Sequence, residues 1–251
     1  MRKKLSIFLF ITMIASSFLV GRGNAAPTDL FLKANEAYRS GNYEKALERY
    51  NELAKEAPGA EVYYNMANAD FKLNHIGQAI LNYERARKLN PRERDIVYNL
   101  NYARTFLEYK IEDKRNWYSK EILDLLEYVQ LKECALVLAF VCFLLLLSVV
   151  LHLYVKKRFE LGRVGVLLLT FFVVAAILSS VKFHQTYFQK KAVVIARKID
   201  VRFGPSDEDK LAFSLAEGIE VKVDEQSNDW YRLTLVSGES GWAPKNGIVI
   251  V

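Results

Sequence analysis

Two apolar runs near the middle of the chain limit its fold more than any other feature. Residues 134–154 (CALVLAFVCFLLLLSVVLHLY) contain no Asp, Glu, Lys or Arg, and neither do residues 164–181. A helix rises about 1.5 Å per residue, so about 20 such residues cross a hydrocarbon core about 30 Å thick. The sequence therefore predicts two transmembrane helices, at 134–154 and 164–181, joined by a short loop.

The loop between the two runs, residues 155–163 (VKKRFELGR), is rich in lysine and arginine and has one acidic residue, Glu160. Short loops with an excess of Lys and Arg stay on the cytoplasmic side of a membrane. The loop is therefore predicted to be cytoplasmic. The segments before and after the hairpin are predicted to lie on the opposite side.

The first residues have the pattern of a secretory signal peptide. A basic head (residues 2–4) precedes an apolar stretch (5–20) and a small-residue exit (23–25), which predicts a signal peptide over residues 1–25. The alternative is an uncleaved anchor. Cleavage would leave the new N-terminus outside the cytoplasm, so the signal peptide and the basic loop predict the same topology.

The formal net charge of +6 does not indicate a nucleic-acid partner. Most of the excess lies in the basic head of the predicted signal peptide and in the loop between the apolar runs. Nucleic-acid binding needs Lys and Arg gathered on one folded surface, where they replace counterions along the phosphates. The two exported segments have nearly balanced charge, so no nucleic-acid partner is expected.

Two segments of the N-terminal half repeat one pattern. GNYEKALERYNELAKEAP (41–58) and NHIGQAILNYERARKLNP (74–91) share an alanine, a tyrosine and a closing proline at matching positions. This resembles the tetratricopeptide repeat, a helix–turn–helix unit of about 34 residues. Residues 96–106 match the first helix of such a unit but no matching second helix follows. Residues 26–113 are therefore predicted to form two full repeats plus a capping helix.

The resemblance implies a surface for protein binding. In this family, first-helix side chains line a concave groove in which asparagine amides can bond to the backbone of an extended peptide. Basic residues at matching positions could meet an acidic residue or a terminal carboxylate. The alternative is that the asparagines only cap and solvate the helices. The candidate groove residues are Asn35, Arg39, Asn65, Asn68, Lys72 and Asn99.

The segment between the repeats and the first apolar run, residues 114–133, is amphipathic. Ile122 and Leu125 fall on one helical face, with charged residues mostly elsewhere. Trp117 and Tyr128 suit the headgroup zone of a bilayer. The segment is predicted to be an interfacial helix that contacts membrane lipid or a stalk that leads into the first span. A partner site is a further alternative.

The C-terminal part changes to a strand pattern. Ile219, Val221 and Val223 alternate with charged residues, and turn residues punctuate the remainder. The segments VRFGPS, EGIEV, WYRL and the late GW resemble the bacterial SH3-like domain. The resemblance implies a small all-β barrel over residues 190–251.

The same resemblance marks a candidate surface at Trp230, Trp242 and Pro244. The segment GWAPKNG keeps the proline of a proline-peptide groove but has Gly247 where eukaryotic relatives have a tyrosine, so proline-rich peptides are not the expected ligand. The alternative is that both tryptophans are core or rim residues. In bacterial relatives this domain is linked to cell-wall or protein binding.

The sequence has no pattern of a catalytic or metal site. It contains no phosphate-binding loop, no nucleophile elbow and no metal-ligand spacing. The histidines are scattered over a repeat turn, an apolar run and a linker (His75, His152 and His184). The chain is expected to be non-enzymatic and to need no cofactor.

The predicted fold is a multidomain membrane protein with an all-α tetratricopeptide-repeat array, two transmembrane helices and a C-terminal all-β SH3-like barrel. This order of parts resembles the BatE family of the Bat aerotolerance operon over essentially the whole chain. The resemblance implies a component of a bacterial cell-envelope complex, beside membrane proteins with von Willebrand A domains and a MoxR-type ATPase. Two functions remain open. One is a scaffold for these proteins, and the other is a sensor or anchor whose barrel binds peptidoglycan.

Overall fold

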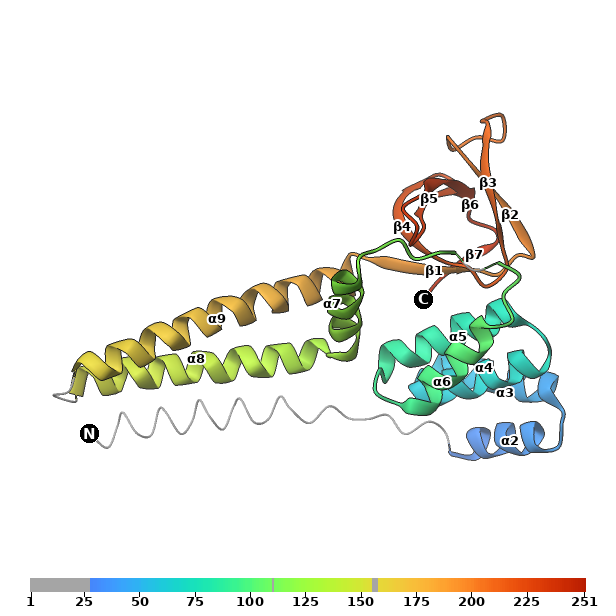
Figure 1. Cartoon of the computed structure of the whole chain (residues 1–251). Coiled ribbons are helices and arrows are strands. Elements are labelled where there is room, and N and C mark those ends of the chain that lie inside the picture. The colour runs from blue at the N-terminus through green and yellow to red at the C-terminus, as the bar shows by residue number, and fades with distance from the viewer. Residues whose placement is uncertain (1–27, 110, 155–157) are drawn as a thin grey trace.

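The computed structural model describes residues 28–109, 111–154 and 158–251. Figure 1 shows a bundle of short helices, a long helical hairpin, and a barrel of strands that lies against the helix bundle. The predicted signal peptide (1–25) and the start of the predicted cytoplasmic loop (155–157) lie outside the described residues.

The N-terminal bundle has the helix–turn–helix order that the repeats predict. Its helices are α2 (Thr28–Arg39), α3 (Tyr43–Glu56), α4 (Ala60–Lys72), α5 (Ile76–Leu89) and α6 (Arg94–Arg104). The recurring residues Ala46 and Ala79 have no exposed surface. They lie where paired helices pack, and their small side chains let these helices approach closely. The structure thus confirms the predicted all-α fold of this part, with the helices in the order α2–α3, α4–α5 and a single α6.

Helices α8 (Leu131–Tyr154) and α9 (Arg158–Tyr187) pack side by side as a hairpin (Figure 1). Both are long and apolar enough to cross a membrane, and only 11% of the most apolar window of α8 and 6% of that of α9 are buried within the protein. Such extensive exposed apolar surface favours contact with lipid. Helix α9 continues past the apolar run through residues 182–187, because no glycine or proline interrupts it there.

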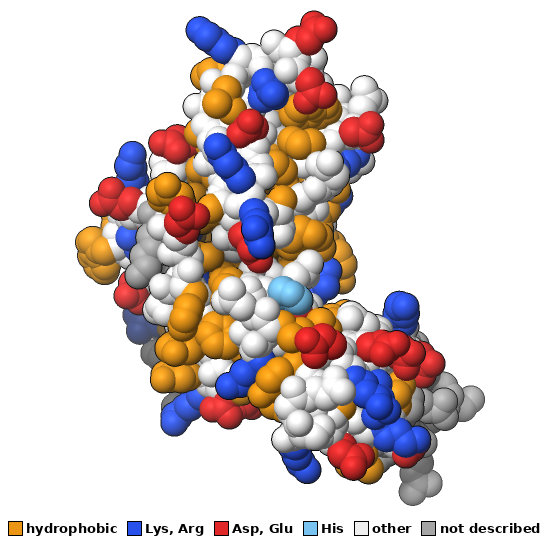
Figure 2. All heavy atoms as spheres, turned by 90° about the vertical axis from the view of Figure 1, so that its right-hand side faces the viewer, with side chains coloured by type: hydrophobic (Ala, Val, Ile, Leu, Met, Phe, Trp, Pro, Cys, Tyr) orange, Lys and Arg blue, Asp and Glu red, His pale blue; other side chains and the backbone are white. Residues whose placement is uncertain are grey.

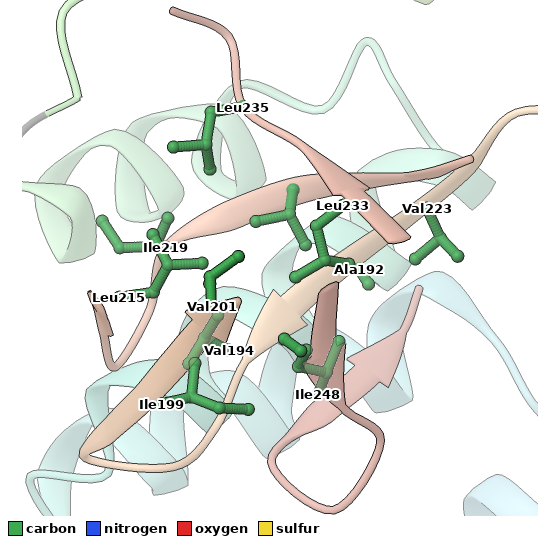
Figure 3. Close-up of a cluster of buried hydrophobic side chains, with 12 residues drawn as sticks. Ala192, Val194, Ile199, Val201, Leu215, Ile219, Val223, Leu233, Leu235 and Ile248 are labelled. Atoms are coloured by element: carbon green, nitrogen blue, oxygen red, sulfur yellow. The ribbon is translucent and has the colours of Figure 1, made fainter. Parts of the chain in front are cut away.

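The C-terminal part is an all-antiparallel barrel. Its strands are β1 (Lys190–Val194), β2 (Lys198–Arg202), β3 (Leu211–Ala216), β4 (Glu220–Ser227), β5 (Trp230–Thr234), β6 (Ser240–Pro244) and β7 (Ile248–Ile250). They form one 7-stranded sheet in the order β3-β2-β6-β5-β4-β1-β7. The alternation predicted around β4 is confirmed, since Val221 and Val223 are buried while Lys222 is exposed. Figure 3 shows buried side chains from several strands pointing into one interior.

The barrel and the repeat array share an apolar contact. Strand β1 is buried on both faces at its end: Ala192 and Val194 belong to the barrel core, whereas Val193 packs with the core of the array. Antiparallel strands with one solvated face alternate, so a strand buried on both faces must be covered by another element. That element is the array, chiefly α5. On the face shown in Figure 2, acidic and basic side chains are interspersed over the surface and form no single basic area.

Candidate functional site

Asparagine side chains join the first helices of successive repeats. The Oδ1 atom of Asn35 on α2 accepts a hydrogen bond from the hydroxyl of Tyr50 (2.6 Å) and a longer one from Nδ2 of Asn65 on α4 (3.4 Å). Burial raises the pKa of Tyr50 to about 12, helped by the nearby Tyr38. The Tyr50 hydroxyl therefore stays a neutral donor.

The same arrangement recurs one repeat later. Asn68 Oδ1 accepts from the hydroxyl of Tyr83 (2.6 Å) and from Nδ2 of Asn99 on α6 (3.2 Å). The Asn99 amide also donates to the Tyr64 hydroxyl (2.9 Å). Burial raises the pKa of Tyr83 as well. Helices α2, α4 and α6 thus lie side by side, and we call the surface that they form the first-helix face.

The structure therefore brings the predicted asparagines together in two pairs, Asn35 with Asn65 and Asn68 with Asn99. At least one oxygen in each pair is already used inside the array, which supports the helix-stabilising alternative for these groups. The other two candidate groove residues, Arg39 and Lys72, are exposed in the last turns of α2 and α4. Peptide binding at this face stays a prediction, and these two side chains are the exposed charged groups among the candidate residues.

An aromatic cluster on the first-helix face was not among the sequence candidates. The rings of Phe71, Tyr102 and Phe106 lie within 5.1–5.6 Å of one another, measured between centroids. Phe106 is 51% exposed and Tyr98, one turn before Tyr102, is 70% exposed. The spacing of Tyr98, Tyr102 and Phe106 is helical, so the sequence did contain the signal. Exposed aromatic rings in a cluster are typical contact residues of protein interfaces.

The three barrel candidates lie together on the outer side of β5 and β6. Trp230 pairs directly with Pro244, and Trp242 is the next residue but one on β6, opposite Arg232. Side chains two residues apart share a face of a strand. Ala243, which lies between Trp242 and Pro244, belongs to the core cluster, and its partner Tyr231 on β5 packs against that cluster. Both tryptophans are half-buried and neither belongs to the core cluster. They are rim residues that expose part of each ring.

A third surface is the helix α7 (Trp117–Tyr128), which crosses the end of the hairpin that faces the soluble parts (Figure 1). Val129 has an extended backbone (φ −85°, ψ 134°), so the chain turns there before α8 begins. Trp117, Ile122 and Leu125 are 76%, 55% and 62% exposed. If the hairpin spans a bilayer, this helix lies along the bilayer surface, where exposed aromatic and aliphatic side chains are stabilised.

A buried carboxylate holds the array and the barrel together. Glu84 on α5 is almost fully buried and accepts hydrogen bonds from Arg87 (2.8 Å) and from Arg104 on α6 (2.8 Å). Arg104 also donates through Nε to Glu220 at the start of β4 (2.8 Å). Burial raises the pKa of Glu220, and the neighbouring charge of Glu84 adds to the effect. Arg104 therefore pairs with two carboxylates, one from each domain.

The same ion-pair network reaches the juxtamembrane helix. Glu127 on α7 pairs with Arg87 of the array and with Lys191 on β1 of the barrel. Partial burial disfavours its ionised form, but the charges of Lys191 and Arg87 outweigh burial and lower the pKa of Glu127 to about 2. The array, the barrel and α7 are thus joined by one network of paired charges. Within the described residues, no group of three or more His, Cys, Asp or Glu side chains is placed to hold a metal ion.

Comparisons with known proteins agree with this architecture. Residues 60–93, which contain α4 and α5, match the family model of the tetratricopeptide repeat. Residues 197–248 match that of the bacterial SH3 domain. No curated protein matches the chain. Both matched families are binding modules and not catalytic domains, so the chain combines two binding modules with two helices that could span a membrane.

Proposed function

We propose that the protein is a non-enzymatic scaffold of a bacterial cell envelope, anchored in the cytoplasmic membrane by α8 and α9. The repeat array and the SH3-like barrel would act outside the cytoplasm and hold partner proteins of one membrane complex. One observation carries the proposal: two binding modules are joined to each other at one end of an apolar helical hairpin. A chain built in this way presents binding surfaces close to a membrane.

The proposed topology has two independent supports. The barrel contacts the array, so both must lie on the same side of any membrane that the hairpin crosses, and two spans between them meet that condition. The Lys- and Arg-rich segment at 155–163, most of which forms the start of α9, favours the cytoplasm for the other side. The array and the barrel would then be extracytoplasmic, as the predicted signal peptide also requires.

A reporter enzyme that folds only outside the cytoplasm tests this orientation. Fused behind a flexible linker after Val251, it is expected to be active, whereas the same reporter inserted at Gly162 is expected to be inactive. A reporter that works only in the cytoplasm should give the opposite pair of results. Activity of the first reporter at Gly162 would show that the orientation is the reverse of the proposed one. Activity of the first reporter at neither position would show that the hairpin does not carry the C-terminus across the membrane.

The partners proposed for the array are membrane proteins of the same complex. The resemblance of the domain order to the BatE family points to sister proteins with von Willebrand A domains and to a role in tolerance of oxygen or other stress. The first-helix face offers two features for such a partner. Exposed Arg39 and Lys72 would attract an acidic segment, and the exposed rings of Tyr98 and Phe106 would bury its apolar residues.

Crosslinking in native membranes tests this assignment. The double variant Arg39→Ala/Lys72→Ala is expected to lower the yield of crosslinks to the von Willebrand A-domain proteins by about tenfold, since two charge contacts of about 0.7 kcal/mol each would be lost. The matched control is Lys45→Ala/Lys55→Ala on α3, which removes two exposed charges from a second helix. Equal yields from the two double variants would rule out the first-helix face as the binding surface.

The second candidate function is binding of peptidoglycan through the barrel. It is favoured by the half-buried Trp230 and Trp242, which share one outer face with Pro244, because exposed indole rings stack well on apolar sugar faces. Sedimentation of the detergent-solubilised chain with purified cell wall distinguishes the two functions. If the chain co-sediments with the cell wall and the double variant Trp230→Ala/Trp242→Ala does not, the sensor or anchor function is favoured. If the wild-type chain does not co-sediment, binding of peptidoglycan is ruled out and the scaffold function is favoured.

A further inference from the structure

The outer sides of the second helices, α3 and α5, differ between the two repeats in a consistent way. Three positions of α3 that are exposed correspond to three positions of α5 that are buried. The corresponding pairs are Glu44 and Gly77, Glu48 and Leu81, and Asn51 and Glu84. These positions are spaced as i, i+4 and i+7, so they form one helical face. In repeat 1 this face is polar and solvated, whereas in repeat 2 it is covered.

The barrel supplies the cover. Val193 of β1 has no exposed surface and packs in one cluster with Ile80 and Leu81 of α5 and with Leu100 of α6. Val249 of β7 joins the same cluster at its edge. In a complete third repeat, a second helix would follow α6 and pack against α5 and α6. In the part of the chain that the structure describes, no helix packs there after α6, and the β1–β7 side of the barrel contacts α5 and α6 instead.

The barrel also completes the N-terminus of α5. Helix α3 is capped within its own repeat, because Asn42 accepts a hydrogen bond from the Lys45 amide and Glu44 places an acid in the first turn. Helix α5 has His75 at the capping position, without a capping bond, and no acid in its first turn. The missing group comes from the barrel: Glu217 Oε1 accepts a hydrogen bond from the amide of Gly77 (2.7 Å).

Two glycines allow this close approach. A Cβ atom on Gly77 would lie 2.6 Å from Cγ of Glu217 and 3.0 Å from the carbonyl oxygen of Val194. A Cβ atom on Gly218, which follows the capping residue and has φ +82°, would lie 2.3 Å from a methyl group of Leu107. Glycine on each side of the interface therefore leaves room for backbone and side chains that a larger residue would displace.

We propose that the SH3-like barrel is the closing element of the repeat array. Its β1–β7 side takes the place of the second helix that the third repeat lacks, and Glu217 caps α5 from outside the array. The barrel thereby holds α6 against α5, and with α6 it holds Asn99 and the aromatic residues of the first-helix face. The binding surface of the array is complete only while the barrel is docked.

Hydrogen exchange of the full chain in detergent micelles tests this role. Gly77→Ala adds the methyl group that the interface cannot accept, so the amides of α6 and of the first turn of α5 are expected to exchange about tenfold faster, which corresponds to a loss of about 1.4 kcal/mol. The matched control is Glu44→Ala, which places alanine at the corresponding position of α3, away from the barrel. Exchange of α6 in this control should equal that of the wild type.

A second variant removes the cap without adding bulk. Glu217→Ala is expected to increase exchange at the first turn of α5 and in α6, whereas Glu239→Ala, in an exposed turn of the barrel, should change neither. Wild-type exchange of α6 in both Gly77→Ala and Glu217→Ala would overturn the proposal. The measurement involves no partner protein, so its outcome does not depend on whether the first-helix face binds one.

Discussion

Replacing Arg104 with alanine is expected to lower the free energy of unfolding by about 3 kcal/mol. Arg104 pairs with Glu84 of the array and with Glu220 of the barrel, and Glu84 is only 3% exposed. Without Arg104, two neighbouring carboxylates would face each other in a poorly solvated contact. Arg87 still pairs with Glu84 and a third of Arg104 is exposed, so the loss falls at the lower end of the range for buried ion pairs.

Thermal unfolding followed by circular dichroism in detergent measures the loss, expected as a fall in melting temperature of about 6–12 °C. The control is Arg94→Ala, on the same helix but exposed, which should shift the melting temperature by less than about 2 °C. Burial already raises the pKa of Glu220 and Arg104 opposes that rise, so without Arg104 the pKa of Glu220 rises further and lowering the pH protonates this carboxylate in the folded state. Part of the lost stability should therefore return as the pH is lowered from neutral. Equal melting temperatures of the two variants at neutral pH would show that the ion pairs of Arg104 do not stabilise the contact between array and barrel.

The elements of this protein could be predicted because their patterns are local. The apolar runs at 134–154 and 164–181, the recurring Ala46 and Ala79, and the alternation around Val221 each lie within a few turns of helix or one strand. Periodicity of that kind follows from the geometry of one element and does not depend on its neighbours. The helical array, the two apolar helices and the barrel were all predicted correctly as element types for this reason.

The contact between array and barrel could not be predicted in the same way, because it joins residues far apart in sequence. Glu217 caps a helix that begins at Ile76, and no local pattern connects these positions. Two local traces of the contact are present. Residues 192–195 (AVVI) are apolar without alternation, which indicates a strand covered on both faces. Glu84 stands where repeat 1 has the exposed Asn51, but burial of a carboxylate is visible only once its two arginines are placed.

The role of the candidate asparagines could not be predicted from the sequence for a different reason. A polar side chain at a repeated position on a first helix can bind a ligand or bond to the neighbouring helix, and sequence spacing is the same for both. The structure reveals the Tyr83 hydroxyl as the partner of Asn68. The position of Tyr83 within its own repeat predicted a packed ring but not where its hydroxyl points. The most exposed part of the predicted site is therefore its basic residues, whereas its asparagines are half-buried and hydrogen-bonded within the array.

Removing the ring of Tyr83 is expected to have the largest effect of any single change in the array. Tyr83 is 2% exposed, packs against Tyr64 with 5.9 Å between ring centroids, and donates to Asn68. Tyr83→Ala leaves a cavity at the centre of the array and removes the hydroxyl partner of Asn68. The expected loss is about 3–5 kcal/mol in the free energy of unfolding. By circular dichroism, this corresponds to a fall in melting temperature of at least about 6 °C.

Two further variants separate packing from hydrogen bonding. Tyr83→Phe keeps the ring and removes only the hydroxyl, and because Asn68 still accepts from Asn99, a loss of about 1 kcal/mol is expected. Tyr98→Ala deletes an aromatic ring that is 70% exposed on α6 and should cost less than about 0.5 kcal/mol. The melting temperature is expected to be highest for Tyr98→Ala, lower for Tyr83→Phe and lowest for Tyr83→Ala. If the melting temperature of Tyr83→Phe fell as far as that of Tyr83→Ala, the hydrogen bond between Tyr83 and Asn68 would be the main stabilising contact, and packing of the ring would be secondary.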